Sequence, residues 1–256
     1  MNALAGLLQA ELYGYLLIFC RIGAALMVLP GFGEAFISPR VRLAFALLLT
    51  LAIAPSMPMP LPEMPEKLVT LIGPIAGEVI IGLFFGLFAR ALVAAVETAG
   101  MIISFQMSLA NAVAFNPALA TQGSIIGSFL SITALVLIFA SDTHHVIILA
   151  LADTYLLMPI GQIPPFQDLA DAMARVVATS FSIAMRLAAP FILLGLVFNL
   201  ALGILARLMP QIQIFFVGIP IQLMGGLAVA MIVLTALMGY WLSRFQDAIS
   251  NGLPGL

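Results

Sequence analysis

Five charged side chains lie inside long apolar stretches of the chain, where they could relay protons or ions, or hold helices together. A charge at the centre of a bilayer costs ~2.5–3.5 kcal/mol on insertion scales, so such groups usually face a partner or water. On one helix, Glu78 and Arg90 would lie ~18 Å apart, too far to pair. We favour partners on neighbouring subunits or at helix ends over an ion relay. The five residues are Glu78, Arg90, Glu97, Arg186 and Arg207.

A second group with chemical potential is Asp142 with His144 and His145, whose side chains could bind a metal. Adjacent residues on a helix point apart, so we interpret this group as the interfacial end of a helix. The sequence contains no HExxH, no GxSxG and no phosphate-binding glycine loop. We therefore expect no enzymatic activity, no cofactor and no metal.

The composition is that of an integral membrane protein. Of the 256 residues, 63% are hydrophobic and 8% are charged, against roughly 25% charged in soluble domains. The nine basic residues are scattered singly, so no patch for nucleic acid exists. These features predict an all-α chain embedded in membrane lipid.

Apolar runs predict six spans, but several fit a bilayer badly. A spanning helix needs ~20 apolar residues, and the run from Val41 to Ala54 is shorter. The run from Leu68 to Phe115 would be ~72 Å long as one helix, so it must bend, fold back or leave the membrane. The six runs are 12–30, 41–54, 68–93, 125–150, 180–205 and 213–242.

Proline and glycine divide the chain further. The connector from Met158 to Pro165 suggests a boundary between 1–165 and 166–256, because an acid-rich helix start follows it. The later part reads as a hairpin turning at Pro210. There Pro210-Gln211 interrupts an apolar run, and Gly218 and Pro220 cross the next one. Proline removes a backbone donor, so we predict a helix break at Pro210, Gln211, Gly218 and Pro220, buried within an assembly.

Residues 105–124 form a polar interruption between two apolar runs. Phe115-Asn116-Pro117 should stop a helix, because the residue before proline leaves the α region. Non-helical backbone at this depth is tolerated where it is buried in protein or lines a cavity. We interpret the segment as a re-entrant or pore-facing loop, with an external loop as the alternative. Its uncharged polar residues are Asn111, Asn116, Thr121, Gln122 and Ser124.

Three glycine pairs at four-residue spacing also indicate close helix contacts, because small residues let membrane helices approach. They are Gly73/Gly77, Gly82/Gly86 and Gly123/Gly127.

Three blocks of the chain resemble FliR, the R subunit of the flagellar type III protein-export gate, which has an injectisome counterpart. Residues 21–50 contain the family's arginine, its Pro-Gly-Phe-Gly motif, and a helix start in which proline is followed by a basic residue. Residues 78–117 resemble its central block, and residues 199–223 resemble its most distinctive segment, with Pro210-Gln211 and Gly218-x-Pro220. The likeness covers essentially the whole chain.

The resemblance implies broken helical hairpins that pack into a hetero-oligomeric helical gate. Residues 1–165 would be P-subunit-like and residues 166–256 a Q-subunit-like hairpin. The partners would be the P and Q subunits and the associated export-switch membrane protein. The gate would lie in the bacterial inner membrane at the flagellar basal body and pass unfolded flagellar proteins.

The family's plug loop corresponds to about residues 109–124. The family more often has aspartate at Asn116 and glycine at Ser108, and either departure could change how the loop seals. The constriction residues would be Asn111, Phe115, Asn116, Pro117, Thr121 and Gln122.

Our interpretation is a pore-forming export-gate subunit, with Glu78, Arg90, Glu97 and Arg207 serving subunit packing. The alternative is a self-sufficient secondary transporter or channel with a midplane polar site, which broken helices and buried charges also fit. An intramembrane enzyme is disfavoured, because no nucleophile–base constellation is evident. Dependence on partner subunits would separate the first two.

Overall fold

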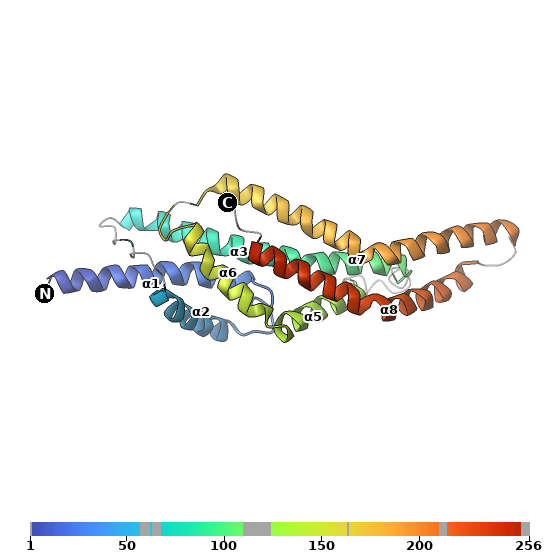
Figure 1. Ribbon diagram of the computed structural model, residues 1–256, viewed down its shortest axis with the longest axis horizontal. Helices are drawn as coiled ribbons and strands as arrows, with labels where there is room; N and C mark the ends of the chain where they lie inside the picture. Colours follow the sequence, from blue (N-terminus) through green and yellow to red (C-terminus); the bar gives the residue numbers. More distant parts are fainter. Residues whose placement is uncertain are drawn as a thin grey trace. The chain divides into compact units, whose positions relative to one another are not determined.

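The computed structural model is all-helical over the residues that it describes, which are 2–56, 62, 68–109, 124–162, 164–209 and 214–251. This confirms the predicted fold class; Figure 1 shows the helices in sequence colours. A short 3-10 turn, η1 (Ala54–Ser56), follows the second helix. The helices are α1 (Asn2–Val28), α2 (Pro39–Ile53), α3 (Leu68–Gln106), α5 (Ile125–Ala140), α6 (Thr143–Leu157), α7 (Phe166–Leu208) and α8 (Ile214–Asn251).

Among the described residues, four helices are long and apolar enough to cross a membrane, and a fifth span is possible if α5 and α6 count as one. The prediction of six spans is therefore wrong. Helix α2 has only 15 residues, and the predicted span 125–150 is bent by 78° between α5 and α6. Helix α3 runs on to Gln106, well past the predicted end at residue 93. The four helical segments are Glu11–Val28, Leu71–Gln106, Phe166–Leu208 and Gly218–Asn251.

The chain forms two compact units. The first unit contains residues 1–91, 138–177 and 246–256, and the second contains residues 92–137 and 178–245. Long helices contribute residues to both units, so neither unit is a continuous stretch of the chain. The predicted division into residues 1–165 and 166–256 is based on resemblance to two kinds of subunit and not on compact units. It stays a prediction.

In the first unit, α1 packs closely on α3. The α1 side chains of Ile18, Ile22 and Ala25 are fully buried at the spacing of one helix face. A Cβ at Gly82 of α3 would collide with the carbonyl oxygen of Arg21, and a Cβ at Gly86 would lie 2.9 Å from that of Ala25. The glycine pair therefore permits the backbone contact that its spacing indicated.

In the second unit, one large aromatic residue ties α8 to α3. Trp241 is fully buried, and its Nε1 donates a hydrogen bond of 3.1 Å to the carbonyl oxygen of Leu92. The ring of Phe245, also fully buried, lies 5.3 Å from the Trp241 ring. A buried tryptophan needs such a partner for its N–H, so this contact fixes the rotation of α8.

The predicted helix break is wrong at two of its four residues. Helix α8 runs without interruption through Gly218 and Pro220. A Cβ at Gly218 would lie 2.9 Å from Leu202 of α7, so this glycine allows close packing of α7 on α8. Pro220 costs the helix one backbone hydrogen bond, and its exposed ring stands clear of the packed face. Helix α7 ends at Leu208 and α8 begins at Ile214; Pro210 and Gln211, between them, lie outside the described residues.

Candidate functional site

A buried ion pair lies at the centre of the first unit. Arg21 Nε of α1 donates to Glu78 Oε2 of α3 across 2.6 Å, and both side chains are fully buried. Each is surrounded in sequence by uncharged, mostly apolar residues. Burial of two charges is tolerated when further hydrogen bonds satisfy their remaining polar atoms.

Helix α6 and the turn after it supply those further contacts to Arg21. Its Nη1 donates to Thr154 Oγ1 at 3.3 Å, and its Nη2 donates to the carbonyl oxygen of Met158 at 2.9 Å. The guanidinium also lies 4.1 Å from the ring centroid of Tyr155, within cation–π distance. Tyr155 Oη in turn donates to the carbonyl oxygen of Ile18 at 3.2 Å.

Glu78 is held by the same turn. Its Oε1 accepts the backbone N–H of Gly161 at 2.8 Å. Gly161 has φ +81°, a left-handed conformation that glycine adopts without cost. The ion pair and its hydrogen bonds therefore join α1, α3, α6 and the 158–161 turn, and we call these groups the buried polar cluster.

A second set of charges fixes the connection from α1 to α2. Arg42 donates from Nε to the carbonyl oxygen of Phe32 and from Nη2 to that of Glu34, both at 3.1 Å. Arg90 Nη1 lies 3.4 Å from Glu34 Oε1 and also donates to the carbonyl oxygen of Val28 at 3.4 Å. The Arg90 side chain is 48% exposed, so this pair is weakly stabilising in comparison with the buried one.

In the second unit, Ser124 fixes the C-terminal end of the predicted plug segment. Its Oγ accepts the backbone N–H of Gly127 at 2.9 Å, which is the N-cap interaction that begins α5. The same hydroxyl lies 2.7 Å from Ser104 Oγ and 3.1 Å from the carbonyl oxygen of Gly100. The start of α5 is thereby held against α3.

Gln222 of α8 fixes the N-terminal end of the same segment. It is 6% exposed, its Nε2 donates to the carbonyl oxygen of Gln106 at 2.6 Å, and its Oε1 accepts from Ser108 Oγ at 2.7 Å. Ser108 has φ +59°, which is uncommon for a residue other than glycine. The hydrogen bond to Gln222 thus holds the chain where it turns out of α3.

Both ends of the predicted plug segment are therefore anchored within the second unit. We call the contacts of Ser124 and Gln222 the loop anchors. Residues 110–123 lie outside the described residues, and the six predicted constriction residues are among them: Asn111, Phe115, Asn116, Pro117, Thr121 and Gln122.

The predicted packing charges fall into two groups. Glu78 and Arg90 have ion-pair partners in their own chain. Glu97 and Arg207 are exposed, and within the described ranges neither lies in an ion pair. Arg207 lies in the last turn of α7, where a positive charge complements the helix dipole.

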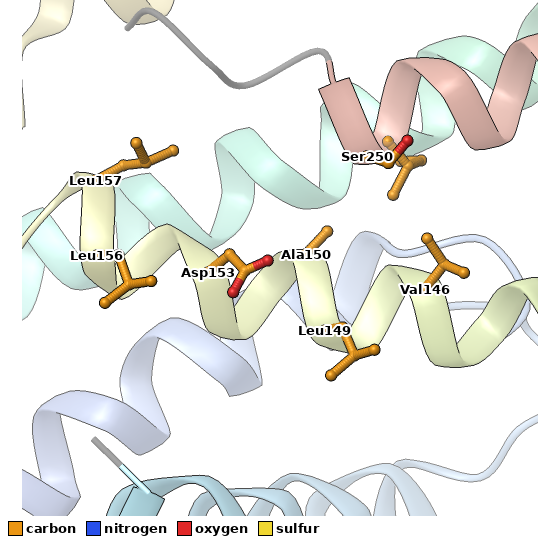
Figure 2. Close-up of a pocket in the computed structure, with 8 residues that line it drawn as sticks. Val146, Leu149, Ala150, Asp153, Leu156, Leu157 and Ser250 are labelled. Carbon is orange, nitrogen blue, oxygen red and sulfur yellow. The ribbon is translucent and has the colours of Figure 1, made fainter. Parts of the chain in front are cut away.

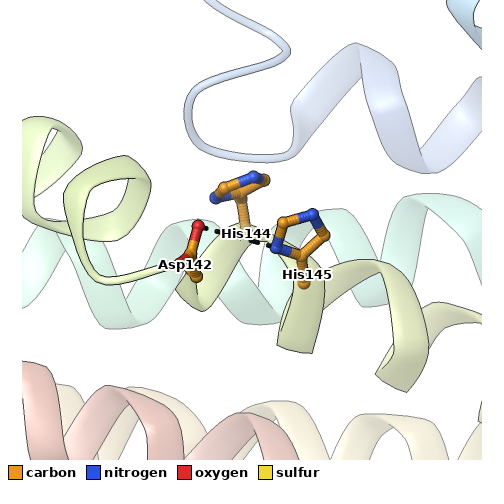
Figure 3. Close-up of side chains that lie close together, drawn as sticks. All are labelled: Asp142, His144 and His145. Atoms are coloured by element: carbon orange, nitrogen blue, oxygen red, sulfur yellow. Dashed lines mark ion pairs between the residues drawn. The ribbon is translucent and has the colours of Figure 1, made fainter.

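Asp142, His144 and His145 come together at the start of α6, as Figure 3 shows. The expectation that the two histidines point apart is wrong, since their ring centroids are 4.1 Å apart. Asp142 has φ +55° and places both histidines in the first turn of the helix. His144 also packs at 5.2 Å on Phe139, and His145 Nδ1 lies 3.8 Å from Asp142 Oδ1. Aromatic packing holds the two rings together. The possible ligand atoms of the three residues all lie within 4.8 Å of one another, so the group could hold a metal ion.

An open hollow of ≈ 280 Å³ lies between α6 and the end of α8 in the first unit (Figure 2). Asp153 is the charged residue in its lining, and the remaining lining is mostly aliphatic. No second titratable group in the lining could act with Asp153 in acid–base chemistry. The lining residues are Val146, Leu149, Ala150, Asp153, Leu156, Leu157, Ile249 and Ser250.

The contacts described so far hold the helices and the two ends of the predicted plug segment in place, and the outer faces of the helices are apolar. The family described as "Bacterial export proteins, family 1" matches residues 12–248. The chain belongs to this family.

Relatives within the bacterial export proteins match the chain along most of its length. The flagellar biosynthetic protein FliR of Caulobacter vibrioides is 38% identical over 249 residues, covering 97% of this chain and 98% of the relative. FliR of Escherichia coli is 33% identical, covering 81% of this chain and 79% of the relative. The Yop proteins translocation protein T of Yersinia pestis is 27% identical over 86% of this chain. The resemblance drawn from the sequence is confirmed.

Sequence reasoning missed two residues that organise this export protein. Arg21 was part of the FliR-like block but was not recognised as the partner of Glu78. The available signal was one arginine in the first apolar run and one acid in the third, since lone opposite charges in membrane helices tend to pair. Gln222 gave a weaker signal, because a single glutamine in an apolar helix does not identify its partner.

Proposed function

We propose that the chain is a subunit of the flagellar type III protein-export gate in the bacterial inner membrane. The observation that carries the proposal is the end-to-end match with FliR of Caulobacter vibrioides, over 97% of this chain and 98% of that one. Four apolar helices of membrane-spanning length support the membrane location. The lower identity to the Yersinia protein, 27%, favours a flagellar over an injectisome host.

In this proposal the chain forms part of the pore wall at the basal body and catalyses no reaction. Residues 1–165 act as a P-like part and residues 166–256 as a Q-like hairpin. Support for the hairpin comes from α7, which begins at Phe166, and from the Gly218–Leu202 contact that packs α8 on α7. P and Q subunits and the export-switch membrane protein would surround the chain, and unfolded flagellar proteins would pass beside it.

The charges support contacts with those subunits. Glu97 and Arg207 are exposed on apolar helices and lack ion pairs among the described residues. A charge in such a helix is costly without a partner, so we assign both to contacts with neighbouring subunits. Glu78 and Arg90 have ion-pair partners within their own chain, and a role for these two in subunit packing stays a prediction.

We further propose that residues 109–124 plug the pore. Support comes from the loop anchors, which fix the chain just before this segment and at its last residue. Deleting Asn111–Gln122 should make membranes leaky to ions and small molecules when the complete gate is present. A deletion of Met57–Leu61 in the proline-rich connector serves as the control. Unchanged permeability in a gate that still assembles would contradict the plug role.

A mild-detergent pull-down from the native membrane tests the proposed function itself. Identification of the copurifying chains by mass spectrometry should reveal two small apolar partners in excess over this chain. Recovery of the chain alone or as a homo-oligomer would overturn the export-gate proposal in favour of a self-sufficient transporter or channel. Solute flux into liposomes containing the purified chain would then be the next measurement.

A further inference from the structure

Two arginines from different helices of the second unit meet at one tyrosine. Arg186 of α7 donates from Nη1 to Tyr240 Oη of α8 at 3.3 Å. The Arg244 guanidinium carbon lies 5.4 Å from the Tyr240 ring centroid. Both arginines are exposed and Tyr240 is half-buried. The three side chains, which we call the arginine pair with its tyrosine, place two positive charges against one tyrosine.

No carboxylate among the described residues neutralises this pair. The ion pairs of the described chain join other residues, and Asp247, one turn beyond Arg244, is not in one. Two adjacent guanidinium groups repel each other, so holding them together requires an anion or open water. Arg186 and Arg244 lie on helices with apolar outer faces. A bound anion therefore stabilises the two guanidinium groups more than open water does.

The position of the pair along its helices marks a membrane surface. Residues 187–206 of α7 carry no charge and are bounded by Arg186 and Arg207. This run is ~30 Å long as a helix, which matches the hydrocarbon thickness of a bilayer. On α8 the uncharged run ends at Tyr240, Trp241 and Arg244, the residue types that gather at membrane–water interfaces. Arg186 and Arg244 therefore stand at the same membrane surface.

An exposed aliphatic track begins below Arg186 on the same face of α7. Its side chains follow Arg186 by 7, 11, 14 and 18 positions, the spacing of one helix face. A chain lying along them would reach toward the bilayer centre from the arginine pair. The four residues and their exposed fractions are Leu193 at 64%, Val197 at 58%, Leu200 at 61% and Ile204 at 63%.

We infer that Arg186, Tyr240 and Arg244 bind the phosphate of an anionic phospholipid whose acyl chain lies along the aliphatic track of α7. Guanidinium groups match phosphate oxygens with paired hydrogen bonds, and the Tyr240 hydroxyl is close enough to share the headgroup. Basic pockets between membrane helices bind acidic headgroups in this way. The buried Trp241 and Phe245 beside the pair fix the helix that carries it. This inference does not depend on the proposed export function.

The chain has a built-in probe for this site, because Trp241 is its single tryptophan and neighbours Tyr240. The full-length protein would be reconstituted in vesicles of phosphatidylcholine containing either brominated phosphatidylglycerol or brominated phosphatidylcholine. Quenching of Trp241 measures the binding of each lipid relative to the other. The wild-type chain should prefer phosphatidylglycerol. The preference should fall about fivefold for each arginine replaced, from ~1 kcal/mol per basic residue.

Three variants make the result specific. Arg186→Gln/Arg244→Gln should abolish the preference, whereas Arg186→Lys/Arg244→Lys, which keeps the charges, should retain part of it. The matched control, Arg40→Gln/Arg175→Gln, removes two other exposed arginines, one of α2 and one of α7, and should leave the preference intact. An unchanged Trp241 emission maximum would verify folding in each variant.

Two results would overturn the inference. Equal loss of preference in the control would mean that general surface charge attracts the lipid. A preference that is present in the isolated chain but absent in the complete complex purified from membranes would mean that a partner's acidic side chain covers the arginines. Added inorganic phosphate distinguishes a headgroup site from a free-phosphate site, since it should not displace the lipid.

Discussion

Arg21 and Glu78 are 57 residues apart in sequence, yet Nε and Oε2 lie 2.6 Å from each other and neither side chain reaches solvent. Thr154, Met158 and Gly161 satisfy the remaining polar atoms of the two groups. A buried pair of this kind is weak evidence for stability in itself, because desolvation offsets much of the attraction. Its consequence is geometric: α1, α3 and α6 have one mutual register in which all these bonds form.

Removing one partner of this pair should destabilise the first unit strongly. Arg21→Met or Glu78→Leu alone leaves an uncompensated buried charge, which costs about 3–5 kcal/mol. The double variant removes both charges and should lose less than either single variant. Thermal unfolding in detergent, followed by circular dichroism, measures the order of the three midpoints. A double variant less stable than both singles would contradict the uncompensated-charge explanation.

Gly82 should tolerate no side chain, whereas Gly203 of α7 should accept one. A Cβ at Gly82 would collide with the Arg21 carbonyl oxygen and meet the Ala24 Cβ at 3.0 Å, so Gly82→Ala must push α1 away from α3. Nothing lies within 4 Å of a Cβ at Gly203. Gly203→Ala should therefore be neutral or stabilising by up to ~1 kcal/mol, from helix propensity. The two unfolding midpoints test this, and equal effects would show that α1 does not press on Gly82.

The exposed pair of Arg90 and Glu34 should matter far less than the buried one. Its N–O distance is 3.4 Å and its side chains are 48% and 22% exposed, so its loss should cost about 0–1 kcal/mol. Arg90→Gln and Glu34→Gln should each lower the unfolding midpoint slightly. High salt should reduce the difference from wild type, because exposed charges are screened. A loss comparable to that of Glu78→Leu would mean that the pair is buried by another subunit in the assembly tested.

The sequence predicted the helical class, the short α2, the start of α7 at Phe166 and the tight contact at Gly82 and Gly86. These features depend on local rules: apolar run length, helix-start chemistry and the missing Cβ of glycine. The extent of helices was harder to predict. Ser141 and Asp142 break an apolar run that hydropathy reads as continuous, whereas Gly218 and Pro220 interrupt the pattern without ending α8.

The contacts between side chains that lie far apart along the chain could not be predicted from one sequence. Glu78 was recognised as a costly buried charge, but which of several arginines neutralises it depends on the register of α1 against α3. The same holds for Gln222, whose two hydrogen bonds reach Gln106 and Ser108 across more than 100 residues, with separations of 116 and 114. Helix periodicity predicts which face of a helix carries such a side chain. Which neighbouring helix that face contacts depends on tertiary packing.

Gln222 should control how firmly the predicted plug segment is attached. Gln222→Leu removes the donor to the Gln106 carbonyl and the acceptor for Ser108, and leaves two half-buried polar groups without that partner. Because these groups are only half-buried, the cost should lie at or below the low end of about 1–3 kcal/mol. The Leu109 amide, which donates to the Ser104 carbonyl at 3.0 Å, should then exchange its hydrogen faster. If residues 109–124 seal the pore, the assembled gate should also leak more in this variant.

Two further variants separate anchoring from general destabilisation. Ser108→Ala removes the hydrogen bond to Gln222 Oε1 but keeps the one from Gln222 Nε2 to the Gln106 carbonyl, so its effect on Leu109 exchange should be intermediate. Gln246→Leu removes a hydrogen bond of similar kind, from Nε2 to Thr143 Oγ1 at 2.7 Å, in the first unit. It should reduce stability without raising exchange at Leu109 or leakage through the gate. Equal leakage from Gln246→Leu and Gln222→Leu would show that loss of stability, rather than release of the segment, opens the pore.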